Sequence, residues 1–597
     1  MRTELADAAA TSPAPDPSLG RPGWAKWGSA GIVWTAWVAM TAAALMLVVR
    51  YGSNVPSWDD WDMVPVLTGH QPVTAGWLWS QHNEHRIPIP RLVLVGLAKV
   101  FGIDFRIPMV ANVLATAAVG AAAILVAARL RGRASITDAF FPLVLLHWGH
   151  AVNFIWGWQV QFFSSAVLAG VALLAVAVGT RPGVAAAAAC AVLLPLCGAN
   201  GLGMTPALAV WLVTVAVLWW RLGRRGAAAA VAAAAAVGTL LSGLYFVGYE
   251  PVPYHPTGGT GIMLRTTPKF VTLGWGPVAR AGWPWLGLVT MAAGVAAVWW
   301  AGRAFVRSPA ERVRAAGIVC FVGAIASLAL GLGRSRDGFE LRYVALAVPG
   351  LMAVYLATLL YAPRRMGGAV QVGMLLVAAA SLWPNSSAGA TYAANLRGEL
   401  TAFERAAAAG TPVPRLAARF REWLHPHDDV ISEYLPMLSG AGIHPYSAVP
   451  QTVPLRELDV PLDPASAAGV DWDPATSTAT VRGSFADAHL EFALPAAVHA
   501  AGIRLRYVPL DPQTPAPYTS VSWAPDAGSG FEASRRRKVS ATGDRHTWGP
   551  LVWTRINDPV VTQTAWVDGP VAKIRVAPDL MPGRFRLISL TVLVPAE

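Results

Sequence analysis

Residues 31–50 read GIVWTAWVAMTAAALMLVVR, a stretch whose only charged residue is the last one, Arg50. A helix needs roughly 20 apolar residues to cross the hydrocarbon layer of a bilayer, so this stretch predicts a membrane-spanning helix. It lacks the small-residue cleavage site of a signal peptide, and we interpret it as a permanent anchor. Residues 1–29 begin with a segment rich in Pro, Ala and Asp, and we expect them to form a disordered cytoplasmic tail.

Apolar runs of this kind recur as far as Trp383 in a chain of 597 residues that is 54% hydrophobic and only 13% charged. The pattern predicts a polytopic α-helical membrane domain over residues 30–384. We expect about 11 transmembrane helices, of which the third and fifth are short: 30–50, 106–130, 136–152, 159–179, 182–199, 204–221, 226–248, 283–302, 313–333, 341–361 and 366–384.

The placement of arginines predicts the orientation, because short loops rich in Lys and Arg face the cytoplasm. Alternate loops are short and basic, and contain Arg129, Arg131 and Arg133; Arg181; Arg221, Arg224 and Arg225; Arg303, Arg307, Arg312 and Arg314; and Arg364 and Arg365. These basic loops lie on the same side of the membrane as the N-terminus, which is therefore cytoplasmic, and loop 51–88 is extracytoplasmic. Because the number of crossings is odd, the C-terminal domain is extracytoplasmic as well. We expect a multi-pass protein of the plasma membrane, whose net charge of +12 needs no nucleic acid partner.

Two other segments of the membrane domain are distinctive. Residues 92–98 are apolar but too short to cross, and they predict an amphipathic helix at the interface. Loop 249–281 is rich in Pro, Gly and Thr, and is long enough to act as a mobile lid.

The composition changes after residue 384. Residues 385–464 are expected to be a helical linker region, because apolar residues recur at helical spacing, as in Leu396, Leu400, Phe403 and Ala407. From about residue 465, apolar and polar residues alternate between turns rich in Gly, Pro and Asp, over 480–485, 490–494, 503–507 and 574–576. This alternation predicts an extracytoplasmic β-sandwich over residues 465–597.

Three carboxylates are concentrated in Trp58-Asp59-Asp60-Trp61-Asp62, shortly after the first crossing. Charge beside lipid is costly, so we expect this cluster to face water or a substrate. Adjacent carboxylates raise one another's pKa, which suits a general base, and they also suit a divalent ion held against a phosphate. The alternative is a solvated turn that caps a short helix.

A second polar cluster, His82-Asn83-Glu84-His85-Arg86, follows in the same loop. His82 and His85 are three residues apart and would share one face of a helix, which would end at the prolines that follow. A metal site would need a third ligand, and none is evident. We favour polar contacts from His82, Glu84 and His85 to a substrate. Arg86 would bind a phosphate through its planar guanidinium, and a purely structural role is the alternative.

Two more clusters are expected on the extracytoplasmic side. The first lies between apolar helices and contains amides, which suit sugar hydroxyls, and indoles, which suit sugar ring faces. Its residues are Asn153, Trp156, Trp158, Gln159 and Gln161. Interfacial anchoring is an equal alternative for these residues. The second offers arginines to a phosphate or pyrophosphate, or else pairs them with Asp337 and Glu340: Arg334, Arg336 and Arg342, followed by Tyr343.

Other kinds of site are not indicated. The sequence has no Walker loop, no dinucleotide fingerprint and no zinc-type cysteine spacing. The cysteines lie within apolar runs and predict neither a disulfide nor a metal site: Cys190, Cys197 and Cys320.

The chain resembles the integral-membrane glycosyltransferases that use polyprenyl-phosphate sugars, the GT-C superfamily. The resemblance is carried by the aspartate motif Trp58–Asp62 in the first external loop, by the interfacial segment that follows, and by the number of crossings with an external C-terminal domain. The plan is similar to that of actinobacterial cell-wall arabinofuranosyltransferases, whose tails resemble carbohydrate-binding modules. Residues 574–586 resemble strands of such tails.

The resemblance implies an inverting transfer of a sugar from a polyprenyl-phosphate donor to a cell-wall or lipid-linked glycan acceptor on the extracytoplasmic face. It implies Asp60 as the base, with Asp59 or Asp62 as alternatives. It implies no obligatory cofactor, although some members use a divalent cation (Mg, Mn or Ca). The rival hypotheses are a transporter or flippase for a lipid-linked glycan, in which charge is expected near the bilayer midplane, and a structural membrane protein.

Overall fold

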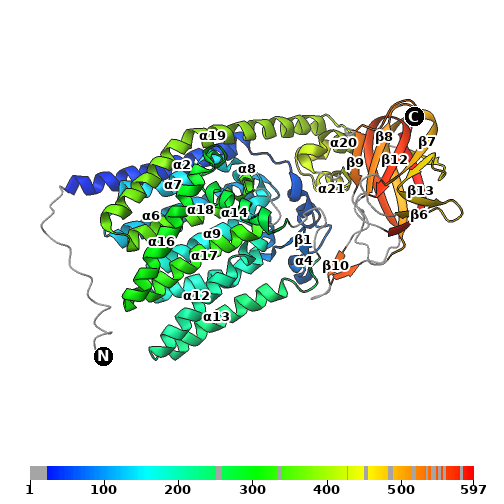
Figure 1. The fold of residues 1–597 in the computed structure, drawn as a ribbon. Coiled ribbons are helices and arrows are strands. Elements are labelled where there is room, and N and C mark those ends of the chain that lie inside the picture. The colour runs from blue at the N-terminus through cyan, green and yellow to red at the C-terminus, as the bar shows by residue number, and fades with distance from the viewer. Residues whose placement is uncertain are drawn as a thin grey trace. The chain divides into compact units, whose positions relative to one another are not determined.

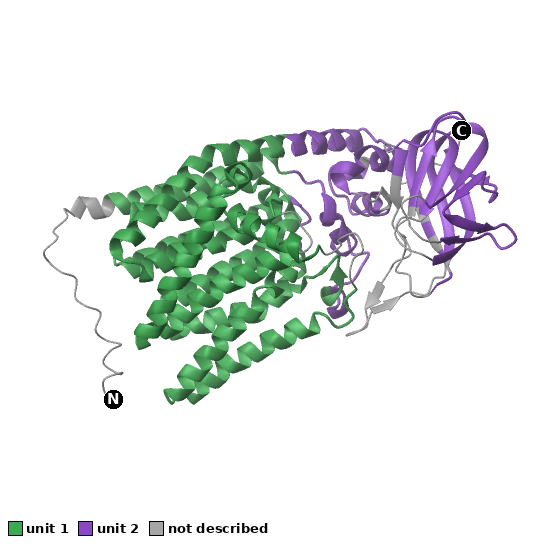
Figure 2. Ribbon diagram, in the orientation of Figure 1, with its two compact units in different colours: residues 1–52, 78–97, 106–394 green, residues 53–77, 98–105, 395–597 purple. Residues whose placement is uncertain are grey.

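A computed structural model shows the fold of the chain (Figure 1) and describes residues 23–250, 258–333, 338–425, 428–449, 455–481, 488–511, 519–532, 535–539, 546–548, 553–555, 560–578 and 583–596. The chain divides into two compact units (Figure 2). The first unit comprises residues 1–52, 78–97 and 106–394, and the second comprises residues 53–77, 98–105 and 395–597.

The first unit is built from apolar helices: α2 (Gly23–Tyr51), α6 (Arg106–Arg131), α9 (Val160–Val178), α10 (Arg181–Leu193), α12 (Thr205–Arg221), α13 (Arg225–Leu244), α14 (Thr260–Leu273), α16 (Trp285–Arg307), α17 (Arg312–Gly333), α18 (Val344–Tyr361) and most of α19 (Arg364–Ala408). In the described residues, eight helical stretches are long and apolar enough to cross a membrane. Residues 181–197 and 205–221 form shorter apolar helices. These features are compatible with a multi-pass membrane protein.

Helix α18 forms the centre of the first unit, and nearly every residue from Val344 to Thr358 is buried. Helices α12 and α13 run side by side at the edge of the unit (Figure 1). Helix α13 leaves Leu240 exposed, and α16 leaves Leu288 and Val289 exposed. Because lipid chains are as apolar as these side chains, such exposure suits helices that face lipid.

The expected third crossing, 136–152, is not one helix. The chain forms a series of short turns instead: η2 (Ile136–Ala139), α7 (Phe140–Leu145), η3 (Trp148–His150), α8 (Ala151–Phe154) and η4 (Gly157–Gln159). Irregular backbone is tolerated at membrane depth only where protein or water, not lipid, surrounds it. Most residues from Asp138 to Phe163 are buried within the unit, which explains how this segment dispenses with a regular helix.

The buried ion pair between Arg131 and Asp138 stabilises the start of segment 136–159. Asp138 accepts hydrogen bonds from Arg131 Nη1 at 2.7 Å, from the Tyr355 hydroxyl at 2.8 Å and from the backbone N–H of Ser135 at 3.0 Å. Arg131 also donates to Gln371 on α19 at 3.3 Å. The network therefore joins η2 to α6, α18 and α19.

The expected lid over 249–281 is wrong in its second half, because Thr260–Leu273 forms α14 and Val278–Gly282 forms α15. Residues 251–257 lie outside the described part. The sequence misled because Pro268 lies inside α14. Packing against α17 overrides that signal, and the Thr266 hydroxyl donates to the Gly333 carbonyl at 2.9 Å.

The expected interfacial segment forms α5 (Pro88–Phe101). Its inner face is buried through Pro88, Arg91 and Leu94, while Leu92 and Phe101 are exposed. The segment is thus a helix with an exposed apolar side, as an interfacial helix requires.

The second unit contains α3 (Val64–Leu67), α20 (Val413–Leu424), α21 (Asp428–Gly440), η8 (Tyr446–Ala448) and a sheet. The 385–464 region does not begin with a break, since α19 continues to Ala408. It ends in strand, because β3 starts at Leu455. The amphipathic α20 buries Leu416, Phe420 and Leu424 within the unit.

The sheet has nine described strands in the order β5-β6-β13-β7-β12-β8-β9, with β3 paired to β13 and β4 to β7, and every pairing is antiparallel. Its strands are β3 (Leu455–Val460), β4 (Ser466–Ala468), β5 (Val470–Asp473), β6 (Thr478–Val481), β7 (His489–Pro509), β8 (Thr519–Ala524), β9 (Arg536–Val539), β12 (Val561–Pro578) and β13 (Gly583–Pro595). A separate hairpin pairs β10 (His546–Trp548) with β11 (Trp553–Arg555). Alternate residues such as Leu490, Ile503 and Ile574 form the core, as the period-two pattern predicts.

Candidate functional site

The aspartate motif folds as a short 3-10 turn, η1 (Trp58–Met63), in the second unit. Ser57 precedes the turn in an extended conformation, and its backbone N–H donates to Asp60 Oδ2 at 3.2 Å. Asp60 is only 3% exposed, whereas Asp59 and Asp62 are half-buried. Asp60 therefore caps the turn, as the structural alternative predicted, but it is buried and not solvated, and Asp59 and Asp62 are the more accessible carboxylates.

The tryptophans of the motif differ from each other. Trp61 is fully buried, whereas Trp58 is 44% exposed. Trp58 has a φ of +52°, a left-handed conformation that is rare for a bulky residue. Such strain persists only where surrounding contacts hold it, and it is concentrated at functional sites.

The second cluster belongs to the first unit and forms a hairpin, not a helix. Strand β1 (Gln81–His82) pairs with β2 (His85–Arg86), with His82 opposite His85. The expected shared helix face was wrong because Asn83 adopts a left-handed φ of +48°, which turns the chain back on itself. The Gln81 amide holds the hairpin to Glu250, accepting from its N–H at 3.1 Å and donating to its carbonyl at 2.6 Å.

Arg86 is fully buried, and its guanidinium is used by the protein itself. It donates to the carbonyls of Tyr245 at 2.8 Å, Trp79 at 2.9 Å and Val247 at 2.8 Å. Burial lowers the pKa of Arg86, and the Tyr245 hydroxyl donates to the Glu84 carbonyl at 3.0 Å. In this geometry Arg86 and Tyr245 hold the hairpin in place.

The hairpin contacts the third polar cluster, residues 153–161. The rings of His82 and Trp158 lie 4.7 Å apart, and the Trp158 indole donates to Gln161 Oε1 at 3.0 Å. His85 Nδ1 accepts the backbone N–H of Ala199 at 3.3 Å, so its proton lies on Nε2, 3.8 Å from Glu84 Oε1. The first unit thus brings together the hairpin, η4 and the turn around residue 199.

Gly198 makes this approach possible. Its φ of +105° is nearly restricted to glycine, and a Cβ there would lie 3.2 Å from Ile87 Cγ2. The sequence shows a helix break at this position but gives no sign that it faces His85. Tyr245, at the end of an Ala-rich helix, was likewise not predicted as a site residue.

Several buried amide atoms around this cluster have no hydrogen-bond partner in the described part of the protein. They are Asn153 Oδ1, Gln159 Oε1 and Nε2, Gln161 Nε2 and Asn200 Nδ2, all on residues at most 3% exposed. Buried polar groups nearly always have partners, so such atoms imply ordered water or a ligand. Trp156, by contrast, is half-buried and does not belong to this set.

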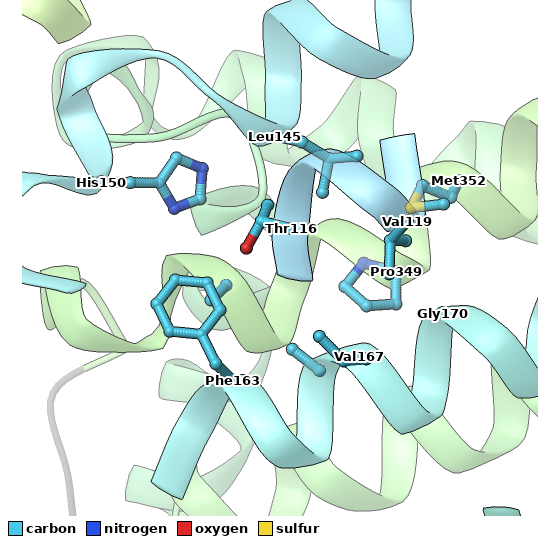
Figure 3. A pocket seen from close by; sticks show the side chains of 11 residues that line it. Thr116, Val119, Leu145, His150, Phe163, Val167, Gly170, Pro349 and Met352 are labelled. Carbon is cyan, nitrogen blue, oxygen red and sulfur yellow. The ribbon is translucent and has the colours of Figure 1, made fainter. Parts of the chain in front are cut away.

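His150 extends the same polar segment into an apolar pocket of the first unit (Figure 3). His150, Phe163 and Thr116 surround one end of the pocket, while Val119 and Met352 lie at the other (Figure 3). His150 Nε2 donates to the Val144 carbonyl at 3.0 Å, which leaves Nδ1 as an acceptor without a partner among the described residues. The neighbouring His147, whose ring lies 4.7 Å away, has no described partner for either nitrogen.

The fourth cluster is only partly described. Arg334 and Arg336 lie outside the described residues. Arg342 pairs with Glu340, with 2.6 Å between Nη2 and Oε2, and lies over the ring of Tyr343. Tyr343 is buried against Phe162, with 5.5 Å between ring centroids. The predicted alternative of charge pairing therefore holds for Arg342.

The cysteines are unpaired, as expected.

No protein-family model matches the chain, and no curated protein is significantly similar to it.

Proposed function

We propose that this protein is a membrane glycosyltransferase of the GT-C type. It would move a sugar from a polyprenyl-phosphate donor to a cell-wall or lipid-linked glycan on the extracytoplasmic face of the plasma membrane. The proposal includes eleven traverses of the bilayer, the third being the irregular segment 136–159, and a C-terminal β-sandwich that acts like a carbohydrate-binding module.

The observation that carries the proposal is the set of buried amide atoms of Asn153, Gln159, Gln161 and Asn200 that find no partner in the part of the chain that the structure describes. A sugar offers hydroxyls that both donate and accept, and amides match both roles. An apolar ligand would leave these atoms unsatisfied at a cost, and a simple anion would not use the carbonyl oxygens. His82, His85 and Glu84 supply further polar groups beside them.

The reaction needs a base that removes the proton of the acceptor hydroxyl. The aspartate turn supplies three carboxylates, and burial and the capping bond of Asp60 favour Asp59 or Asp62 as the group that meets the acceptor. If the reaction uses a divalent ion, these same carboxylates are the ligands that Mg²⁺, Mn²⁺ or Ca²⁺ prefers. Arg342 and Tyr343 would contact the polyprenyl-phosphate sugar donor.

Replacement of each aspartate by asparagine tests the assignment. Asparagine keeps an oxygen that can cap the turn but cannot accept a proton, so Asp60→Asn should retain most activity if Asp60 is only a cap. Asp59→Asn or Asp62→Asn should abolish transfer, with a loss of 10²-fold or more for the true base. Transfer is measured in membranes with lipid-linked sugars extracted from a deletion strain, in which the unused donor accumulates.

The result that contradicts the proposal is equally clear. If all three variants fold and transfer normally, or if deletion leaves both lipid-linked sugars and glycan unchanged, the glycosyltransferase assignment fails. A flippase would instead leave the donor accumulated on the cytoplasmic face, which the accessibility of the lipid-linked sugar in sealed vesicles would reveal.

A further inference from the structure

The segment that leads into the aspartate turn is held by the C-terminal part of its own unit. The Ser53 hydroxyl donates to Glu404 Oε1 at 2.6 Å, and Glu404 pairs with Arg397 at 3.1 Å. The Tyr446 hydroxyl donates to the Asn54 carbonyl at 3.1 Å. Residues 350 to nearly 400 positions away in sequence thus fix the backbone just before the carboxylates.

Ser57 connects these contacts to the turn itself. Its hydroxyl donates to the Trp423 carbonyl at the end of α20, at 3.2 Å, while its backbone N–H donates to Asp60. Helix α21 also packs against η1 and α3. The orientation of the turn therefore depends on α20, α21 and η8 as well as on its own sequence.

Tyr446 is suited to this role because it is fully buried and packs against Phe403, with ring centroids 6.1 Å apart. Burial holds the pKa of Tyr446 well above its usual value, so the hydroxyl remains a donor at any physiological pH. The hydrogen bond from Tyr446 to the Asn54 carbonyl therefore does not change with pH and holds the backbone before the turn.

We propose that residues 395–449 of the second unit position the aspartate turn for catalysis, with Tyr446, Glu404 and Ser57 as positioning residues. Residues 395–449 are then part of the catalytic apparatus, whereas the sheet that follows them keeps its proposed role in glycan binding. The catalytic half of this inference rests on the proposed function, whereas the positioning of the turn does not. The two halves need separate measurements.

Hydrogen exchange of the full-length protein in detergent micelles measures the positioning. Tyr446→Phe keeps the ring but removes the hydroxyl, and Ser57→Ala removes the bond to Trp423. Both should speed exchange of the amides in residues 55–60 by tenfold or more. Tyr361→Phe is the matched control, because it removes a tyrosine hydroxyl bonded to Glu311 in the first unit. Unchanged exchange in Tyr446→Phe would overturn the proposal, even if Ser57→Ala fails to fold.

Transfer kinetics with lipid-linked sugars from the deletion strain measure the catalytic half. The two variants should lower kcat at unchanged KM, because they disorder the base and not the donor contacts, and Ser57→Thr, which restores a hydroxyl, should recover both exchange and kcat. Faster exchange with normal kcat would show that the order of the turn is irrelevant to catalysis and would refute that half. If the variants exchange faster but the unmodified protein itself transfers no lipid-linked sugar, the positioning is supported and the proposed function is refuted.

Discussion

Arg86 shows how a single residue can look like a ligand-binding group in sequence and be used by the fold instead. Its three bonds to carbonyls of residues 79, 245 and 247 fix the hairpin that carries His82 and His85. Lysine has no planar fork and cannot reach the three acceptors together. Each buried carbonyl that loses its donor costs about 1–3 kcal/mol.

We therefore expect Arg86→Lys to lower the thermal unfolding midpoint of the detergent-solubilised protein clearly, with the exposed Arg133→Lys as the control that leaves it unchanged. A normal midpoint combined with lost sugar transfer would instead show that Arg86 contacts a phosphate, as the sequence suggested.

At the scale of elements, the irregular segment 136–159 depends on the buried pair Asp138–Arg131, whose Asp138 side chain has no exposed area. Removing one partner of such a pair leaves a buried charge without compensation, which costs about 3–5 kcal/mol. We expect Asp138→Ala to destabilise the protein by about this amount in a reversible unfolding assay. Tyr355→Phe, which shares the network, should show a non-additive effect in a double-mutant cycle.

The comparison is Glu311→Ala, which breaks the partly exposed pair with Arg314 and should cost at most about 1 kcal/mol. Equal effects of Asp138→Ala and Glu311→Ala would mean that the network does not hold the segment.

Helices and strands with one regular apolar face were predictable from the sequence, whereas a buried segment without regular structure was not. The long helices and the strands at 490–494, 503–507 and 574–576 were expected, because a lipid-facing or core-facing side imposes a regular hydrophobic period. Residues 136–152 were expected to be a helix because their composition is apolar. Most of these residues are buried within the first unit, however, and composition alone does not distinguish that environment from lipid.

The candidate site was predictable as a set of residues but not as an arrangement. The sequence identified the polar clusters because charge and amides are rare in this chain. It could not show that Gly198 lies beside His85 or that Ser57 bonds to Trp423, since these contacts join residues distant in sequence. It also did not show that Asn83 reverses the chain, because a positive φ is uncommon outside glycine. The aspartate motif and the His82–Arg86 cluster, adjacent in sequence, even belong to different units.

At the scale of the whole molecule, the remaining question is sidedness, and the irregular segment is the place to test it. If 136–159 and α9 both traverse the bilayer, then Arg133 and Arg181 lie on the same side, which is the cytoplasmic one. If only α9 crosses, they lie on opposite sides, and every later loop is inverted. Both residues are exposed, as are Gln71 and Ala465, so single cysteines at these positions should be reactive.

We expect an impermeant thiol reagent applied to intact cells to label Gln71→Cys and Ala465→Cys, but to label Arg133→Cys and Arg181→Cys only after the cells are opened. The unmodified protein is the background control, because Cys190 and Cys197 are buried and Cys320 is partly buried. Labelling of Arg181→Cys but not Arg133→Cys in intact cells would show that segment 136–159 does not cross. Protection of Gln71→Cys would place the aspartate loop in the cytoplasm, away from an extracytoplasmic donor sugar, and would remove the basis of the proposed reaction.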